Sequence, residues 1–447
     1  MKSKRSNRRR FLKESAALAG GLALGAIPGH AQVGQGEVPV KQVGLGEVPV
    51  KEDWEAYGVR SRFDKSARIA RDHHALQIPT KEHQTTLWTP LQDQMGIITP
   101  SGLHFAITHA GIPFPDIDPQ QHQLLIHGMV DRPLILTLED LRRLPSVSRI
   151  HFVECNSNTK PTGFGRSVEH MRTVQQTHGY TSCSEWTGVL LSELLGQAGV
   201  QKGASWIIAE GVDQNKLVMS IPMSKAMYDS LVVYGQNGEV LRREQGFPLR
   251  LLVPGFAGVN NVKWLRRIKV VDQPQLSQYE ARTHAETRSA EGRPTGWTWF
   301  RYELGPKSVI IRPSGGQRLP GAGFYDITGL AWSGAGVVRR VEVSTDGGRT
   351  WKDAQLQEPV LPKAQTRFRL DWNWDGGETV LQSRCTDELG QIQPTLTEYA
   401  RTVLGPKARP YPPGYPGDVE GLSYGNCNAI QPWKVMRDGS VHNAMFI

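Results

Sequence analysis

Five segments rich in branched and aromatic residues, spaced between residues 307 and 394, constrain the C-terminal part of this chain more than any other feature. They are KSVIIRPS, FYDITGLAWSG, VVRRVEVSTDGGRTWKDAQL, TRFRLDWNWDG and ETVLQSRCTDELGQIQP. Segments of this composition, with glycine turns such as Asp-Gly-Gly, are typical of antiparallel strands joined by hairpins. The sequence therefore predicts an antiparallel β-sandwich of the immunoglobulin type over residues 295–405.

A different pattern precedes this region, between residues 86 and 273. Short apolar runs bounded by Gly or Pro predict strands at HQLLIHGMV, SRIHFVEC, SWIIAEGVD, SLVVYG and FPLRLLVPG. LTLEDLRRL and TGVLLSELLGQAGV carry apolar residues at helical spacing, and a threonine suited to capping opens each helix. This mixture predicts an α+β domain, and the polar stretch around residues 274–298 predicts its boundary.

The N-terminus predicts where the protein works. An arginine pair precedes Phe-Leu-Lys within residues 8–13, an apolar stretch follows at 16–27, and Gly-His-Ala closes the segment at 29–31. This arrangement is typical of a twin-arginine export signal. The alternative is a membrane anchor, but the apolar stretch is shorter than the roughly 20 residues that cross a bilayer. We therefore expect a periplasmic protein without a membrane span once residues 1–31 are removed.

Two further segments lack helical or strand periodicity. Residues 32–85 contain the imperfect duplication VGQGEVPVK and VGLGEVPVK, punctuated by glycine and proline, which favours a linker. Residues 406–447 include the proline-rich stretch YPPGYPG near their start. We expect this part to be an extended tail that lies against its own chain or against a partner.

The charge balance excludes one class of partner. The chain has 52 Lys and Arg against 43 Asp and Glu, a formal net charge of +9, and part of this excess belongs to the export signal. Because the basic residues form no run beyond that signal, we expect no nucleic-acid partner. A mild surplus of positive charge suits an anionic substrate or an acidic partner protein.

Four cysteines allow further predictions. They could form disulfides in an oxidising compartment, in any of three pairings. No CxxC or CxxCH motif occurs, which predicts that this chain carries neither a covalently attached c-type haem nor a zinc ribbon. Cys155 follows the predicted strand RIHFVE directly and opens a loop of small polar residues. At this point a buried structural cysteine and a functional thiol both stay open.

Six motifs occur in a fixed order along the chain: HFVEC, EGVD, REQGFPLRLLVPGFAG, NNVKWLRRIKV, LAWSG and VEVSTDGGRTW. In order and spacing they resemble the sulfite oxidase family of molybdenum enzymes, and the resemblance covers residues 90–447. The terminal stretch IQPWKVMRDGSVHNA resembles the exported molybdenum subunits of Sox-type sulfane dehydrogenases. The resemblance implies an α+β molybdopterin-binding domain over residues 86–273, followed by an immunoglobulin-like sandwich at 295–405 that supports dimerisation.

The resemblance also implies a molybdenum–molybdopterin cofactor held by one protein thiolate, and Cys155 matches that ligand. Soft sulfur ligands suit a metal that cycles between two oxidation states. The positions that match the family's cofactor-binding residues are His109, Asp213, Gln245, Arg250, Asn261, Val262 and Lys263. Gln245 replaces a histidine of animal sulfite oxidases. Arg250 can bind a phosphate through two parallel hydrogen bonds, and Lys263 can bind it as a point charge.

The remaining departures from the family pattern fall mostly on the substrate side of the metal. Ile107 stands where the family has an arginine. Lys160 occupies the position of a substrate-binding arginine, and Arg166 is a second candidate for holding an anionic sulfur group. The family's active-site tyrosine is replaced, and His284 and Tyr279 are the candidates for its role.

The activity that the resemblance implies is the oxidation of sulfite or protein-bound sulfane sulfur by oxo transfer. Since the chain has no haem motif, we expect electrons to leave through a separate c-type cytochrome. The other expected partner is a sulfur carrier protein or a small sulfur oxyanion, and the expected assembly is a homodimer or a heterotetramer with the cytochrome. Two alternatives stay open: a sulfoxide reductase of the same fold, and an exported binding protein without catalysis, which Ile107 motivates.

Overall fold

The computed structural model describes most of the chain that follows the predicted export signal and linker. Residues 65–447 form one compact unit. Among the described residues, no helix has both the length and the apolar character needed to cross a membrane. The export signal and most of the predicted linker lie outside the described residues, which are 60–61, 63–70, 86–107, 114–159, 172–213, 216–275, 277, 280, 302–404 and 427–445.

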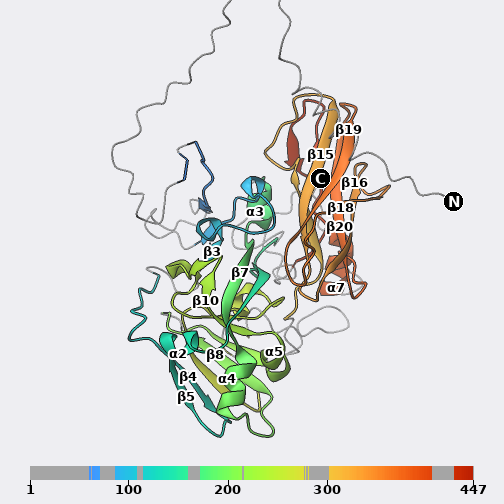
Figure 1. Ribbon diagram of the computed structural model, residues 1–447. Coiled ribbons are helices and arrows are strands. Elements are labelled where there is room, and N and C mark those ends of the chain that lie inside the picture. The colour runs from blue at the N-terminus through green and yellow to red at the C-terminus, as the bar shows by residue number, and fades with distance from the viewer. Residues whose placement is uncertain are drawn as a thin grey trace, which may run out of the picture. The chain divides into compact units, whose positions relative to one another are not determined.

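One five-stranded sheet, here called sheet 1, carries the strand that leads to Cys155. Two of its strands, β7 and β10, are labelled in Figure 1. Its strand order is β11-β10-β7-β6, with β12 paired to β10, and all of these pairs are antiparallel. The strands are β6 (Val147–Glu154), β7 (Thr181–Leu190), β10 (Leu231–Gln236), β11 (Glu239–Val240) and β12 (Arg250–Leu252).

The sequence analysis did not predict β7, although it lies inside sheet 1. Its buried side chains include serines, so it lacks the apolar run that identifies the other strands. The hydroxyls of Ser182 and Thr89 lie 2.6 Å apart, and Ser184 Oγ accepts a hydrogen bond from Gln236 Nε2 at 2.9 Å. Hydrogen bonds between side chains allow this polar strand to be buried.

A second sheet, sheet 2, has the order β5-β4-β13-β8-β9. The pair β13–β4 is parallel and the other pairs are antiparallel. Its strands are β4 (Gln123–Gly128), β5 (Leu134–Thr137), β8 (Trp206–Gly211), β9 (Val218–Pro222) and β13 (Leu265–Val271). The helices of this part whose bounds lie within the described residues are α2 (Leu138–Arg142), α3 (Val174–His178), α4 (Leu191–Ala198) and α5 (Met223–Tyr228).

Of the two predicted helix caps, one is confirmed and the other is wrong. Thr137 caps α2 in a capping box with Asp140, as the sequence predicts. The cap predicted for the next helix is wrong, because Thr187 lies within β7 and α4 begins only at Leu191. Leu190 occupies the N-cap position of α4 and makes no side-chain cap bond.

The described residues of this part also form a small sheet and four single-turn 3₁₀ helices. The sheet has the order β1-β2-β3, formed by β1 (Ile69–Ala70), β2 (Thr86–Trp88) and β3 (Ala106–Ile107). The 3₁₀ helices are η3 (Leu91–Asp93), η4 (Ser101–Leu103), η6 (Arg243–Gln245) and η7 (Gly258–Asn260).

The C-terminal part forms two antiparallel sheets, as the sequence predicts. One has the order β14-β15-β19-β18, and the other has the order β17-β16-β20-β21-β22. The described end of the predicted tail supplies β21 and β22 to the second sheet. The elements are β14 (Lys307–Arg312), β15 (Gly323–Trp332), β16 (Val338–Ser344), β17 (Lys352–Asp353), β18 (Gln355–Leu356), β19 (Thr366–Trp374), β20 (Thr379–Asp387), α7 (Leu396–Leu404), β21 (Trp433–Val435) and β22 (Val441–Asn443).

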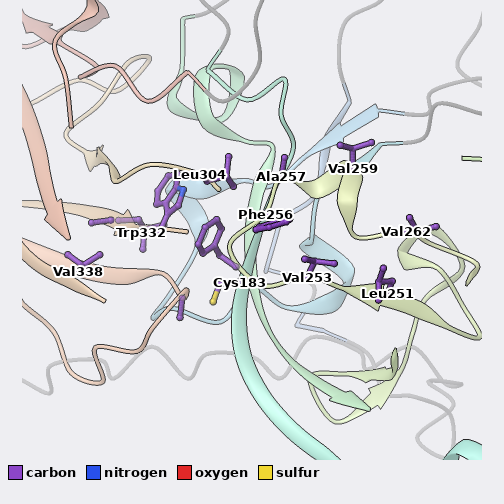
Figure 2. Packing of buried hydrophobic residues seen from close by; sticks show 14 of the residues in the cluster. Cys183, Leu251, Val253, Phe256, Ala257, Val259, Val262, Leu304, Trp332 and Val338 are labelled. Carbon is purple, nitrogen blue, oxygen red and sulfur yellow. The ribbon is translucent and has the colours of Figure 1, made fainter. Parts of the chain in front are cut away.

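The largest hydrophobic cluster contains residues of both sheets and of the sandwich. Figure 2 shows part of it, with Leu251 contributed by β12 and Trp332 by β15. Backbones approach closely here, since a Cβ added at Gly255 would lie 2.1 Å from the carbonyl oxygen of Gly334. The sandwich therefore shares a core with the part of the chain that carries Cys155, a relation that matters for the site.

Candidate active site

Cys155 lies directly after β6, where the strand ends in a tight turn formed by residues 155–159. Its backbone amide donates to the carbonyl oxygen of Tyr180 at 2.9 Å. The amide of Ser157 donates to the cysteine sulfur at 3.4 Å. Cys155 is 5% exposed and lines a pocket. A hydrogen bond donated to sulfur favours the thiolate, which is the form that binds metals.

The pocket has both polar and apolar residues in its walls. Its cavity volume is about 50 Å³. The structure brings six of the predicted cofactor residues to its lining: Cys155, Asp213, Gln245, Arg250, Asn261 and Lys263. The other lining residues, which sequence reasoning did not assign to the site, are Phe105, Ile107, Leu217, Gly258, Val259 and Trp264.

Two cationic side chains face this pocket, and neither is paired with a carboxylate among the described residues. Arg250, at the start of β12, is 3% exposed, and burial lowers its pKa to about 9. Burial, and next the charge of Arg250, lower the pKa of Lys263 to about 7. Within the described part of the chain, Lys263 Nζ donates only to neutral groups, the carbonyl oxygens of Ile107 at 2.8 Å and Glu244 at 2.9 Å.

The donor capacity of these two residues is not used up by the described part of the chain. Neither Arg250 nor Lys263 forms an ion pair with a described carboxylate, and Arg250 Nε is buried without a hydrogen-bond partner there. A buried cation without a counter-ion is costly, and an anion would offset that cost. The arrangement therefore fits a ligand that carries a phosphate, as molybdopterin does.

Gln245 and Asp213 supply the acceptors of the pocket. Gln245 Oε1 accepts from Arg250 Nη1 at 3.2 Å, while its Nε2 donates to the carbonyl oxygen of Phe105 at 2.8 Å. The amide is thus oriented by contacts at both ends. Asp213 is 4% exposed and accepts from the amide of Leu217 at 2.9 Å. Its carboxylate can also accept hydrogen bonds from amino groups of a ligand.

Asn261 and Val262 are placed differently from the other predicted cofactor residues. Asn261 lines the pocket, but its side chain accepts from the amide of Val253 at 2.7 Å and donates to the carbonyl oxygen of Ala257 at 3.1 Å. Its amide group therefore fixes the loop that forms the pocket wall. Val262 is fully buried in the hydrophobic core and does not line the pocket.

The other three cysteines differ from Cys155 in their surroundings. All four cysteines are buried, and Cys183, Cys385 and Cys427 are free thiols. Burial raises the pKa of Cys183 to about 12 and also raises the pKa values of Cys385 and Cys427. None of these three lines the pocket, which leaves Cys155 as its single thiol.

Five predicted site residues lie outside the described residues: His109, Lys160, Arg166, Tyr279 and His284. Their roles stay predictions. Ile107, where the family pattern has an arginine, lies in the pocket wall, and its carbonyl oxygen accepts from Lys263. The ammonium group of Lys263 thus lies at the pocket wall beside Ile107, the position where the family pattern has an arginine.

Comparison with known proteins decides the family. The oxidoreductase molybdopterin binding domain matches residues 109–279, and the Mo-co oxidoreductase dimerisation domain matches residues 297–411. The solved structure of the sulfane dehydrogenase SoxCD from Paracoccus pantotrophus is similar, with a TM-score of 0.77 and 36% identity, over 89% of this chain and 95% of that chain. The chain belongs to the sulfite oxidase family. It is therefore an oxidoreductase with a molybdopterin-binding domain, and the predicted fold class is confirmed.

Curated relatives include members of the sulfite oxidase family with different activities. Mitochondrial sulfite oxidase of Mus musculus is 30% identical over 67% of this chain and 56% of that protein. The Homo sapiens protein is 32% identical, over 62% and 52% respectively. The NADH nitrate reductase of Ulva prolifera is 28% identical, over 76% and 44%. The chain spans about half the length of these relatives, so their whole activities do not transfer to it directly.

Proposed function

We propose that this member of the sulfite oxidase family is a molybdenum-dependent dehydrogenase that oxidises sulfite or protein-bound sulfane sulfur. The observation that carries the proposal is the single pocket thiol, Cys155, which shares its pocket with the uncompensated cations Arg250 and Lys263. The similarity to sulfane dehydrogenase SoxCD, which this chain covers over 95% of its length, supports a sulfur substrate. By comparison, this chain covers less than half of the length of the nitrate reductase.

The residues of the pocket have distinct roles in this proposal. The Cys155 thiolate holds the metal, and Arg250 and Lys263 hold the phosphate of the pterin. Asp213 accepts hydrogen bonds from the amino groups of the pterin, and Gln245 keeps the Arg250 guanidinium in place. When bound, the molybdenum cofactor supplies an oxygen atom to the substrate sulfur and accepts two electrons.

The protein contributes binding, orientation and electrostatics to the reaction. For sulfite, the balance is sulfite plus water giving sulfate, two protons and two electrons. A positive field in a water-poor site stabilises the sulfur oxyanion more strongly than it would in water. Lys160 and Arg166 are proposed to hold the oxyanion, with His284 or Tyr279 in place of the family's active-site tyrosine.

The electrons are proposed to leave one at a time to a separate c-type cytochrome, because this chain has no CxxCH motif. The proposed assembly is a homodimer or a heterotetramer with that cytochrome, in the periplasm. The arginine pair within residues 8–13 supports export. Replacing both Arg8 and Arg9 by Lys should retain the protein in the cytoplasm, as measured by cell fractionation.

Two measurements on protein matured with its export signal test the proposal. Elemental analysis should find close to one molybdenum per chain, whereas a preparation that folds without molybdenum would favour the binding-protein alternative. Cytochrome c reduction should then follow the addition of sulfite, or of thiosulfate together with a sulfur carrier protein. An enzyme that instead oxidises a reduced dye with a sulfoxide or with nitrate, and ignores sulfite and thiosulfate, would contradict the proposed direction and substrate class.

A further inference from the structure

A buried carboxylate precedes Cys155 directly. Glu154, the last residue of β6, is 1% exposed, and both of its oxygens accept hydrogen bonds. Its Oε1 accepts from Lys307 Nζ and from Asn158 Nδ2, the latter at 2.9 Å, and its Oε2 accepts from Trp332 Nε1 at 2.7 Å. The charge of Glu154 is therefore fully compensated.

Two of these three donors come from the sandwich. Lys307 is the first residue of β14 and is 1% exposed, and Trp332 is the last residue of β15 and is fully buried. The ring of Trp332 also packs near Phe152 of β6, with 6.3 Å between the ring centroids. Removing one partner from such a buried pair leaves the other charge unpaired, which is strongly unfavourable.

The same lysine reaches the turn that follows Cys155. Lys307 Nζ donates to Thr159 Oγ1 at 3.1 Å. Thr159 has a φ of 58°, a left-handed conformation that is costly for a β-branched residue and persists only where the surroundings enforce it. Its hydroxyl is also within hydrogen-bond distance of the carbonyl oxygens of Asn158 and Cys427. The turn is thus fixed at its far end as well.

The turn between these points has little freedom. The amide of Asn158 donates to the carbonyl oxygen of Cys155 at 2.9 Å, and its side-chain Oδ1 accepts from the amide of Tyr180 at 3.1 Å. On the opposite side, a Cβ added at Gly258 would lie 3.0 Å from the carbonyl oxygen of Glu154. Cys155 is therefore held between restraints on either side of it.

We propose that Lys307 and Trp332 of the sandwich are positioning residues for the Cys155 thiolate, acting through Glu154. In this view the sandwich forms part of the scaffold of the active site, in addition to any part in dimerisation. The role in catalysis rests on the proposed function. The restraint on the turn at residues 155–159 does not depend on it.

The test uses the full chain as purified, with three variants. Lys307→Met removes the charge and keeps a chain of similar volume. Trp332→Phe removes the donor to Glu154 and part of the ring volume but keeps a ring against Phe152, so it serves if Lys307→Met fails to fold. The matched control is Ser333→Ala, which removes a buried hydrogen bond of 2.9 Å to Asp387 inside the sandwich.

Hydrogen exchange of the amides of residues 155–159 is the first readout, because these amides open when the turn loosens. Lys307→Met should accelerate their exchange about tenfold or more, and Trp332→Phe about threefold, while Ser333→Ala leaves it unchanged. In loaded enzyme, the first two variants should also shift the thiolate-to-molybdenum absorption band and lower kcat with KM within about twofold.

Two results would overturn the proposal. One is an amide exchange rate at residues 155–159 that equals the rate in Ser333→Ala, measured in whichever of Lys307→Met and Trp332→Phe folds. The other is accelerated exchange with an unaltered absorption band and kcat, which would make the network a structural contact alone. If the wild-type chain binds no molybdenum, the proposed function fails, yet the exchange result still decides whether the sandwich restrains the turn.

Discussion

Two lysines of this chain, Lys307 and Lys263, lie in the protein interior under opposite electrostatic conditions. Lys307 is 1% exposed and forms an ion pair with Glu154, which is buried to the same extent. Among the residues that the structure describes, Lys263 donates only to neutral carbonyl oxygens, and burial lowers its pKa to about 7. One cation is compensated within the protein, and the other faces a pocket without a described counter-ion.

This difference separates a structural charge from a binding charge. A buried ion pair whose hydrogen bonds are satisfied resists the loss of either partner. A buried cation without a counter-ion destabilises the empty protein and attracts an anionic ligand. Lys263 and Arg250 are binding charges in this sense, and Lys307 is a structural charge. Residues of both kinds lie close to Cys155 in space.

The largest effect on stability is expected from breaking the compensated pair. Lys307→Met should lower the free energy of unfolding by about 3–5 kcal/mol, because Glu154 is left buried and unpaired. The double variant Glu154→Gln/Lys307→Met should recover most of that loss, since neither charge remains. Urea denaturation of the full chain measures both. A double variant that is less stable than Lys307→Met would show that the pair is not the source of the effect.

Replacing an uncompensated cation should weaken cofactor binding without lowering the stability of the cofactor-free chain. Arg250→Met or Lys263→Met should weaken cofactor retention by about 2–5 kcal/mol, or between about thirtyfold and several thousandfold, since the bound phosphate loses its partner. The stability of the cofactor-free chain should not fall, because a desolvated cation is removed. Molybdenum per chain after gel filtration, together with urea denaturation, checks this pair of outcomes. Full molybdenum content in either variant would contradict the assignment of that residue.

His104 extends the comparison to a buried group that is kept neutral. Burial lowers its pKa from 6.5 to about 3. Between these pH values the unfolded chain binds a proton at His104 and the folded chain does not, so stability falls on acidification. The loss from pH 6.5 to pH 5 should be about 2 kcal/mol. His104→Gln should show a correspondingly smaller difference in unfolding free energy between pH 7 and pH 5. An unchanged difference would show that His104 is not the titrating group.

The smallest effect is expected from an exposed pair of the sandwich. Lys434 of β21 lies 3.4 Å from Glu378, with side chains 28% and 42% exposed. Solvent and salt screen such a pair, so Lys434→Ala should change the free energy of unfolding by less than about 1 kcal/mol. The same urea experiment measures it. A loss as large as that from Lys307→Met would mean that burial does not distinguish these ion pairs.

The predictability of the fold depended on where the apolar residues lie. The strands of the sandwich could be predicted because branched residues and glycine turns identify them, as in β14 and β16. Strand β7 could not, because Ser182 and Ser184 are buried polar residues whose partners, Thr89 and Gln236, are distant in sequence. For the same reason Thr187 was assigned to a helix cap.

The site was predictable only as far as its motifs reach. Short motifs that resemble the sulfite oxidase family contain Cys155, Asp213 and Arg250, and the structure places all three around one pocket. Phe105 and Leu217 belong to the same pocket but lie in no motif that could have identified them. The contact between Glu154 and Lys307 joins residues far apart in the sequence, and nothing in their local patterns indicates it.

The variant Cys155→Ser is the decisive test of whether the sulfur of Cys155 binds molybdenum. We expect this variant to fold with unchanged secondary structure and to lack the thiolate-to-molybdenum absorption band. Its turnover should fall by more than about a hundredfold relative to wild type, a greater loss than that from an outer partner of a metal ligand. Oxidation of sulfite or sulfane sulfur by Cys155→Ser at the wild-type rate would show that this sulfur does not bind the metal.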